Sequence, residues 1–261
     1  MLRFVVNLKS KLNVNTFIRT MAWSRPDTIA YPTTWSKFDG LREINGKKPK
    51  FWIQDITEDL IEPVRHSMMT GFIAEEPLCK YSKFNEDEVS VAEGWELYKH
   101  VLSNKLSVVC MTNDAEGKPK IAGISCLTRI SKDEPHVEFS GKCLTKVMNL
   151  VEYVYSVKNP IDVFKVDEYM TDRGIYILPE YRGQGICNEI LHAWAAVCKA
   201  IGFKVIIGTF TAIGSQKSAD RVGFKELNSF DYAELEKINP DFSLPGIQEH
   251  TKSLRLLYQV V

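Results

Sequence analysis

The alternation of apolar and polar positions predicts a strand and then a helix early in the chain. Residues 51–56 have the character of a short strand, and Thr57 is suited to be the N-cap of the helix that follows. Pro77 should prevent this helix from extending further. The apolar positions that recur at helical spacing are Leu60, Ile61, Val64, Met68 and Phe72.

A hairpin is predicted in the middle of the chain. Two apolar, strand-like runs at 106–111 and 121–127 flank the turn-forming segment 113–119, so they should pair in antiparallel fashion. The other elements expected before residue 160 are a loop-rich segment at 30–50, a helix at about 89–102, an irregular polar segment at 128–143 and a helix at about 144–157.

The last third of the chain predicts a β-α-β unit. A strand at 174–178 ends at Pro179, a tight turn follows at 180–185, and one apolar helical face runs from Ile186 to Ile201. Gly202 is a good C-cap, and a second strand at 204–210 should lie parallel to the first. The elements expected afterwards are a helix at 215–221, a strand from Phe224 and a strand at 254–260. Together these elements predict one mixed α/β domain.

Composition and charge exclude several classes of protein. Among 261 residues, Lys plus Arg and Asp plus Glu are both 33, so the chain has no basic excess typical of nucleic-acid binding. No apolar run approaches the roughly 20 residues that span a bilayer. None of the 6 cysteines forms a C-x-x-C pair, which predicts no zinc or redox motif and favours a reducing compartment such as the cytoplasm.

The first 26 residues are basic and contain no acid. Such a segment is similar to a mitochondrial transit peptide, which would change the expected location. We favour the alternative that it is a mobile leader, or that Met21 is the usual start. The predicted domain organisation is therefore a leader at 1–26 and a single domain at 27–261.

The turn at 181–186 is the strongest candidate for ligand binding. It leaves a strand and opens a helix, whose first N–H groups have no internal partner and lie at the positive end of the helix dipole. A pyrophosphate would be stabilised there, Gly183 and Gly185 would allow close approach, and Arg182 could add a charged contact. The alternative is a tight turn that needs glycine for its geometry alone. Neither the Walker nor the dinucleotide pattern is present.

Residues 174–224 resemble the core of the GNAT acetyltransferase superfamily. The family signature Q/R-x-x-G-x-G/A falls on Arg182, Gly185 and Cys187, although Cys187 replaces the expected Gly or Ala, and the family's Gly-Phe landmark falls on Gly223 and Phe224. The resemblance implies a mixed, mostly antiparallel sheet flanked by helices, with acetyl-CoA bound where two strands separate and no metal. It implies these cofactor-binding residues: Ile177, Leu178, Arg182, Gly183, Gln184, Gly185, Ile186, Cys187 and Asn188.

A second resemblance concerns the acceptor. The run 71–78 is similar to an acidic-Glu-Pro-Leu segment of insect arylalkylamine N-acetyltransferases, and this similarity implies that Glu76 is the general base, with Glu75 as the second choice. An alkylamine with a pKa near 10 is protonated at pH 7, so a base must remove its proton before it attacks a thioester. The alternative is that both acids are solvated charges at a helix end.

The same family has two hydroxyl residues that assist proton transfer. Counting back from Phe224 places them on Thr211 and Ser215. Ser215 could instead be the N-cap of the helix that ends near Arg221. A tyrosine that often serves as general acid in the wider superfamily is replaced by Ala219, so that role is not transferred.

The leading hypothesis is acetyl transfer from acetyl-CoA to a small primary amine, such as dopamine, serotonin or tyramine, by a monomer or weak dimer. Relatives also act on polyamines, protein lysines or longer acyl donors, and these acceptors and donors form the second hypothesis. The third is a CoA-binding sensor or interaction module without catalysis. Metal, nucleic acid and membrane are not expected as partners.

Overall fold

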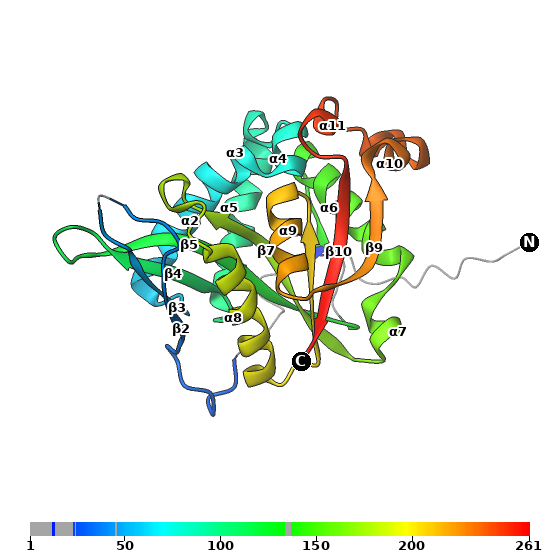
Figure 1. Ribbon diagram of the computed structural model, residues 1–261. Helices are drawn as coiled ribbons and strands as arrows, with labels where there is room; N and C mark the ends of the chain where they lie inside the picture. The colour runs from blue at the N-terminus through cyan, green and yellow to red at the C-terminus, as the bar shows by residue number, and fades with distance from the viewer. Residues whose placement is uncertain (1–11, 14–22, 24, 45, 134–136) are drawn as a thin grey trace, which may run out of the picture.

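The computed structural model describes residues 12–13, 23, 25–44, 46–133 and 137–261. Its centre is one eight-stranded sheet with helices on both faces (Figure 1). In spatial order the strands are β2 (Thr34–Asp39), β3 (Lys50–Asp55), β4 (Val108–Asn113), β5 (Pro119–Ser131), β7 (Glu168–Ile177), β8 (Val205–Phe210), β10 (Ser253–Val260) and β9 (Lys225–Asp231). A separate parallel pair joins β1 (Leu12–Asn13) to β6 (Val137–Glu138).

The sheet is split between β7 and β8. These two strands are parallel and pair at two positions, Met170 with Ile206 and Thr171 with Ile207. Beyond them, β7 continues along β5 as far as Ile177, while β8 continues along β10. All other neighbours in the sheet are antiparallel, so the predicted mixed, mostly antiparallel sheet is confirmed.

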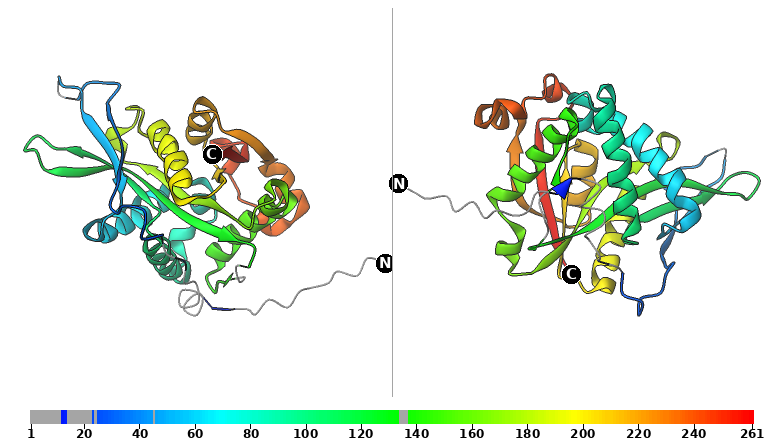
Figure 2. Two further views of the ribbon diagram at one scale, coloured as in Figure 1. Left: turned by 90° about the horizontal axis from the view of Figure 1, so that it is seen from below. Right: turned by 180° about the vertical axis from the view of Figure 1, so that it is seen from behind.

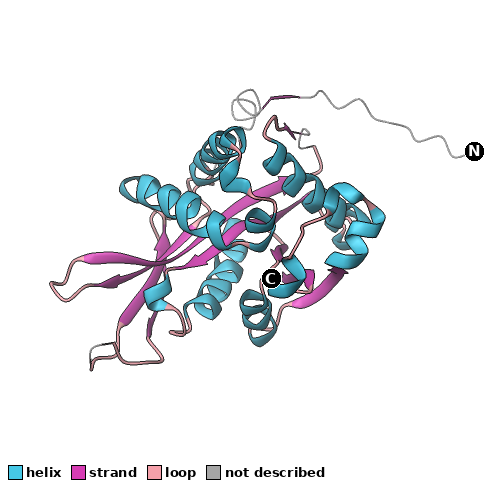
Figure 3. Cartoon of the chain, turned by 90° about the horizontal axis from the view of Figure 1, so that it is seen from above, coloured by secondary structure: helices cyan, strands magenta, loops and turns pink. Residues whose placement is uncertain are grey.

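One face of the sheet is covered by α8 (Ile186–Ile201) and α9 (Ile213–Arg221), which lie in front of the sheet in Figure 1. The apolar stripe of α8, which includes the fully buried Trp194, packs on this face. The views from behind and from above show a further group of helical segments, long and short, on the opposite face (Figures 2 and 3). Those elements are η1 (Glu58–Leu60), α2 (Ile61–Ser67), the π-helical turn η2 (Met68–Phe72), α3 (Ile73–Glu75), α4 (Pro77–Tyr81), η3 (Phe84–Glu86), α5 (Glu88–Ser103) and α6 (Lys142–Val157).

Short helices complete the fold. They are α7 (Pro160–Phe164), η4 (Pro179–Tyr181), α10 (Tyr232–Ile238), η5 (Pro240–Phe242) and α11 (Ile247–His250). Within the described residues, no helix combines the length and the apolar character needed to cross a membrane.

Most elements predicted from periodicity are present, including the hairpin, the long helices and the β-α-β unit with Gly202 as its left-handed C-cap. The segment 30–50, predicted to be loop-rich, also contains β2, which pairs with β3 and which the sequence analysis missed. The prediction of an irregular segment at 128–143 is wrong in part, because β5 runs to Ser131. Thr57 occupies the N-cap position without a side-chain capping bond.

The chain entering β2 is fixed by a buried ion pair. Arg25 Nη1 lies 3.0 Å from Asp55 Oδ2, and both side chains are almost fully buried. Asp55 also accepts bonds from the Thr33 amide and the Trp35 indole. The folded region therefore includes Arg25, which lies within the predicted leader 1–26. The rest of segment 1–26 lies mostly outside the described residues, and its role as a leader stays a prediction.

Candidate active site

A cavity of about 1110 Å³ occupies the split in the sheet. It runs from the turn before α8 to the helices α3 to α6, and it contains the ends of β7 and β8. The predicted site residues that line it are Glu75, Glu76, Ile177, Arg182, Gly183, Gly185, Ile186, Cys187, Asn188, Thr211 and Ser215. The structure thus brings together residues more than one hundred positions apart in sequence.

The turn before α8 has the backbone geometry of an anion site. Gly183 (φ +80°) and Gly185 (φ +84°) are left-handed, a conformation that favours glycine. The first helical bond of α8 runs from the Glu189 amide to the Gly185 carbonyl (3.2 Å). The amides of residues 186–188 therefore precede the helical ladder and point out of the helix end.

Two predicted cofactor-binding residues, Leu178 and Gln184, do not line this cavity. Ile177, the last residue of β7, lines the cavity, whereas Leu178, which follows the strand, lines a second, smaller one. The Leu178 amide donates to the Ala122 carbonyl (3.1 Å). The Gln184 side chain is buried, and its Oε1 accepts the Arg42 amide (2.9 Å).

Arg182 is held at the rim of the cavity by two contacts. Its Nη2 lies 2.6 Å from Glu75 Oε2, and its Nε donates to the Ile177 carbonyl at 3.0 Å. The side chains of Arg182 and Glu75 are 46% and 47% exposed, so their ion pair contributes little to stability. The Glu75 carboxylate is therefore engaged by a cation at the rim of the cavity.

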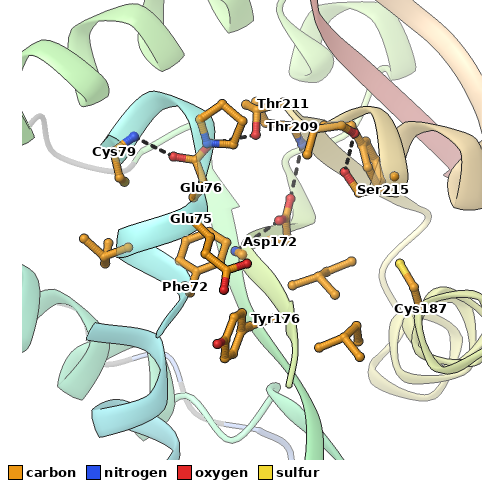
Figure 4. A pocket seen from close by; sticks show the side chains of 18 of the residues that line it. Phe72, Glu75, Glu76, Cys79, Asp172, Tyr176, Cys187, Thr209, Thr211 and Ser215 are labelled. Atoms are coloured by element: carbon orange, nitrogen blue, oxygen red, sulfur yellow. Dashed lines mark hydrogen bonds between the residues drawn. The ribbon is translucent and has the colours of Figure 1, made fainter. Parts of the chain in front are cut away.

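Glu76 lies at the junction of two helices, where its carboxylate is oriented by two donors. It ends the α3 segment and caps α4, whose first residue is Pro77. Its Oε2 accepts the Cys79 amide (2.7 Å) and its Oε1 accepts the Thr211 hydroxyl (2.6 Å). Figure 4 shows these bonds at one side of the cavity, with Cys187 of α8 lying apart from them.

Ser215 lines the cavity without capping α9. The N-cap position is Ala212, so the alternative that Ser215 caps this helix is wrong. The Ser215 hydroxyl donates to the Ala212 carbonyl (2.9 Å), as a hydroxyl in the first turn of a helix can do. Of the two predicted hydroxyl residues, Thr211 is the one in contact with Glu76.

Asp172 is a cavity residue that the sequence analysis missed. It lies where β7 and β8 part, and its carboxylate accepts the amides of Thr209 (3.2 Å) and Gly174 (3.1 Å). Burial raises the pKa of Asp172 to about 6. An acid within a strand-like run two residues before Gly174 could have drawn attention to it, but the predicted strand began only at residue 174.

Part of the cavity wall beside Glu76 is apolar. Phe72 projects from the π-helical turn, and its ring fills the space that a side chain at Gly174 would need, 2.5 Å from an ideal Cβ. Helices α5 and α6 supply most of the remaining wall. The apolar side chains at this end are Phe72, Phe84, Leu97, Tyr98, Leu144, Val147, Met148 and Val151.

Cys187 has the properties of a packing residue. Burial raises the pKa of its thiol above the ordinary value, so the thiol is protonated at neutral pH and is a weak nucleophile. Among the described residues, no cluster of three or more His, Cys, Asp and Glu side chains is placed to hold a metal ion.

Solved structures with a similar fold include insect acetyltransferases. A yellow fever mosquito protein named as a candidate arylalkylamine N-acetyltransferase 7 is 29% identical, with a TM-score of 0.84 over 91% of this chain and 99% of its own. Arylalkylamine N-acetyltransferase 2 of Aedes aegypti is 18% identical, with a TM-score of 0.66 over 80% and 98%. A Drosophila melanogaster polyamine N-acetyltransferase is 15% identical, with a TM-score of 0.63 over 81% and 100%.

No family model matches the chain, and no curated protein does. The structural likeness nevertheless extends over nearly the whole described chain. The fold is that of the GNAT acetyltransferases, and the resemblance to insect arylalkylamine N-acetyltransferases stated from the sequence is confirmed.

Proposed function

We propose that this chain is an acetyl-CoA-dependent N-acetyltransferase whose acceptor is an arylalkylamine such as dopamine, serotonin or tyramine. One observation carries the proposal: a single cavity in the split sheet has an anion-binding turn at one end and an oriented carboxylate at the other. The likeness to the mosquito protein, over nearly the full length of both chains, supports it.

The residues present fit the coenzyme. The amides of residues 186–188 and the two left-handed glycines form a cradle for a diphosphate, while the split between β7 and β8 offers a channel for an extended arm. When bound there, acetyl-CoA supplies the activated acyl group. The cavity volume, about 1110 Å³, lies just above the usual range for ligand sites and suits two substrates.

Strand β7 offers backbone N–H groups at the channel. The Leu178 amide bonds to β5, and hydrogen-bonding direction alternates along an antiparallel pair, so the amides of Ile175 and Ile177 point away from β5. They face the side from which β8 has departed. We infer that one of them stabilises the thioester carbonyl oxygen as it gains negative charge during attack by the amine.

Glu76 is proposed to take the proton from the attacking amine. A carboxylate has about four lone-pair positions, and the Cys79 amide and Thr211 hydroxyl use two of them. The remaining positions can accept a proton directly or through water. The Thr211 hydroxyl donates to Glu76 Oε1 and stabilises this carboxylate while it is charged, which supports the proposed role of Thr211 beside Glu76.

The apolar wall distinguishes between acceptors. An aromatic ring would be stabilised among the apolar side chains of α5 and α6, whereas the second ammonium of a polyamine would lose its hydration there unless it reached the carboxylates of Glu75, Glu76 or Asp172. The cytoplasmic location and the monomeric or weakly dimeric state remain predictions.

A panel of amines tests the proposal. Purified protein is mixed with acetyl-CoA, and released CoA is followed with a thiol reagent for tyramine, dopamine, serotonin, spermine and a lysine peptide. We expect the highest kcat/KM with an arylalkylamine. Preference for spermine or the peptide would replace the acceptor class, and binding of acetyl-CoA in a calorimeter without turnover of any amine would favour the sensor hypothesis.

A further inference from the structure

The β2–β3 hairpin packs directly on the anion-binding turn. An ideal Cβ at Gly183 would lie 3.1 Å from Arg42 Nη1 and 3.2 Å from Arg42 Cζ. The guanidinium of Arg42 therefore occupies the space that the missing side chain leaves. The sequence predicts that Gly183 allows close approach of the ligand. In the structure, Gly183 also allows close approach of the Arg42 guanidinium.

The contact between hairpin and turn is fixed at several points. An ideal Cβ at Gly40 would lie 2.7 Å from Gln184 Oε1, and the same oxygen accepts the Arg42 amide at 2.9 Å. At the base of the hairpin, the rings of Phe51 and Tyr181 meet edge to face with centroids 6.0 Å apart. The contacts at Gly40, before Arg42 in the chain, and at Phe51, after it, therefore hold Arg42 over the turn.

The two arginines at this end of the cavity differ in their partners. Arg182, the arginine of the sequence motif, is engaged by Glu75 and by the Ile177 carbonyl. In the described part of the chain, no carboxylate forms an ion pair with Arg42, which lines the cavity and is exposed. A guanidinium without a counter-ion beside backbone amides is a strong site for a phosphate oxygen.

Resting on the proposed function, we propose that Arg42 binds the diphosphate of CoA from above the turn, as a second phosphate ligand supplied by the β2–β3 hairpin. The amides of α8 hold the diphosphate from below, and Arg42 closes the site opposite them. Gln184 is a positioning residue, because it holds the Arg42 backbone and does not line the cavity itself.

The test compares Arg42→Gln with Lys48→Gln, which removes an exposed cation of the same hairpin that does not line the cavity. Steady-state rates are measured with acetyl-CoA, with acetyl-dephospho-CoA, which lacks the 3′-phosphate, and with S-acetylpantetheine, which lacks the diphosphate as well. We expect Arg42→Gln to raise the KM for the first two donors about fivefold and to leave the third unchanged. Lys48→Gln should match the wild type with all three.

Each other outcome overturns part of the proposal. An effect that vanishes with acetyl-dephospho-CoA would move the contact to the 3′-phosphate, and an equal effect with S-acetylpantetheine would mean that Arg42 acts only through the fold of the hairpin. If the wild type binds CoA in a calorimeter and Arg42→Gln binds it equally well, this inference is wrong while the proposed function stands. If the wild type binds no CoA, the proposed function fails first.

Discussion

The two ends of the cavity are built in different ways. The proposed phosphate end is made mainly of backbone, with left-handed glycines and helix amides within six consecutive residues. The acceptor end is made of side chains from α3 to α6, β7 and β8, and its carboxylate is oriented by Thr211, which lies 135 positions away. A local backbone device can be recognised as a short motif, whereas an assembly of distant side chains cannot.

This difference implies a separation of roles. Changes at the phosphate end should alter the KM for the donor, because backbone amides and cations there act on groups remote from the reaction. Changes at the acceptor end should alter kcat, because the groups there act on the atoms that react.

The largest expected effect is at Glu76. Glu76→Gln should lower kcat between about 100- and 1,000-fold, because the amide cannot accept the amine proton, while the affinity for CoA stays within twofold of the wild type. Steady-state kinetics and calorimetry measure the two quantities. Glu75→Gln is the matched control and should keep most of the rate; unchanged turnover of Glu76→Gln would remove Glu76 from the mechanism.

Asp172 should make stability depend on pH. Its pKa of about 6 in the folded protein lies above the ordinary 3.8, so the stability that it contributes is present below pH 4 and is lost as the pH rises through 6. The free energy of unfolding of the wild type, relative to Asp172→Asn, should therefore fall by about 2–3 kcal/mol between pH 4 and 6.5.

Urea titrations at several pH values measure this difference. Asp241→Asn, at an exposed site, controls for the loss of one negative charge. A constant difference between wild type and Asp172→Asn over this range would mean that the Asp172 carboxylate does not titrate there, and the expected pH dependence would be wrong.

The smallest expected effect is at Gln184. Gln184→Met keeps the length of the side chain but removes the acceptor of the Arg42 amide, so the KM for acetyl-CoA should rise about threefold at an unchanged kcat. The double variant with Arg42→Gln should be no worse than Arg42→Gln alone, because Gln184 acts through Arg42. Additive losses, measured on proteins with matched melting temperatures, would show that Gln184 has a separate role.

The sequence was informative where structure is local. The β-α-β unit, its turn and the Gly202 cap follow from periodicity and glycine chemistry within about 35 residues. Glu76 and Thr211 were named only through a resemblance, since nothing in their separate surroundings indicates that they touch. Arg42 and Asp172 were missed because their roles depend on which segments meet in the fold. The sequence around Arg42 predicts a loop-rich segment instead of the β2–β3 hairpin, and Asp172 lies where two strands part.

The order of strands around the split also has a consequence for biosynthesis. Strands β8 and β9 do not pair with each other, because β10 lies between them and follows both in the chain. During translation, each of them leaves the ribosome before the strand that satisfies its open edge. This half of the sheet therefore closes only after residues 253–260 have been made, and until then its unpaired edges are exposed to chaperones and to other nascent chains.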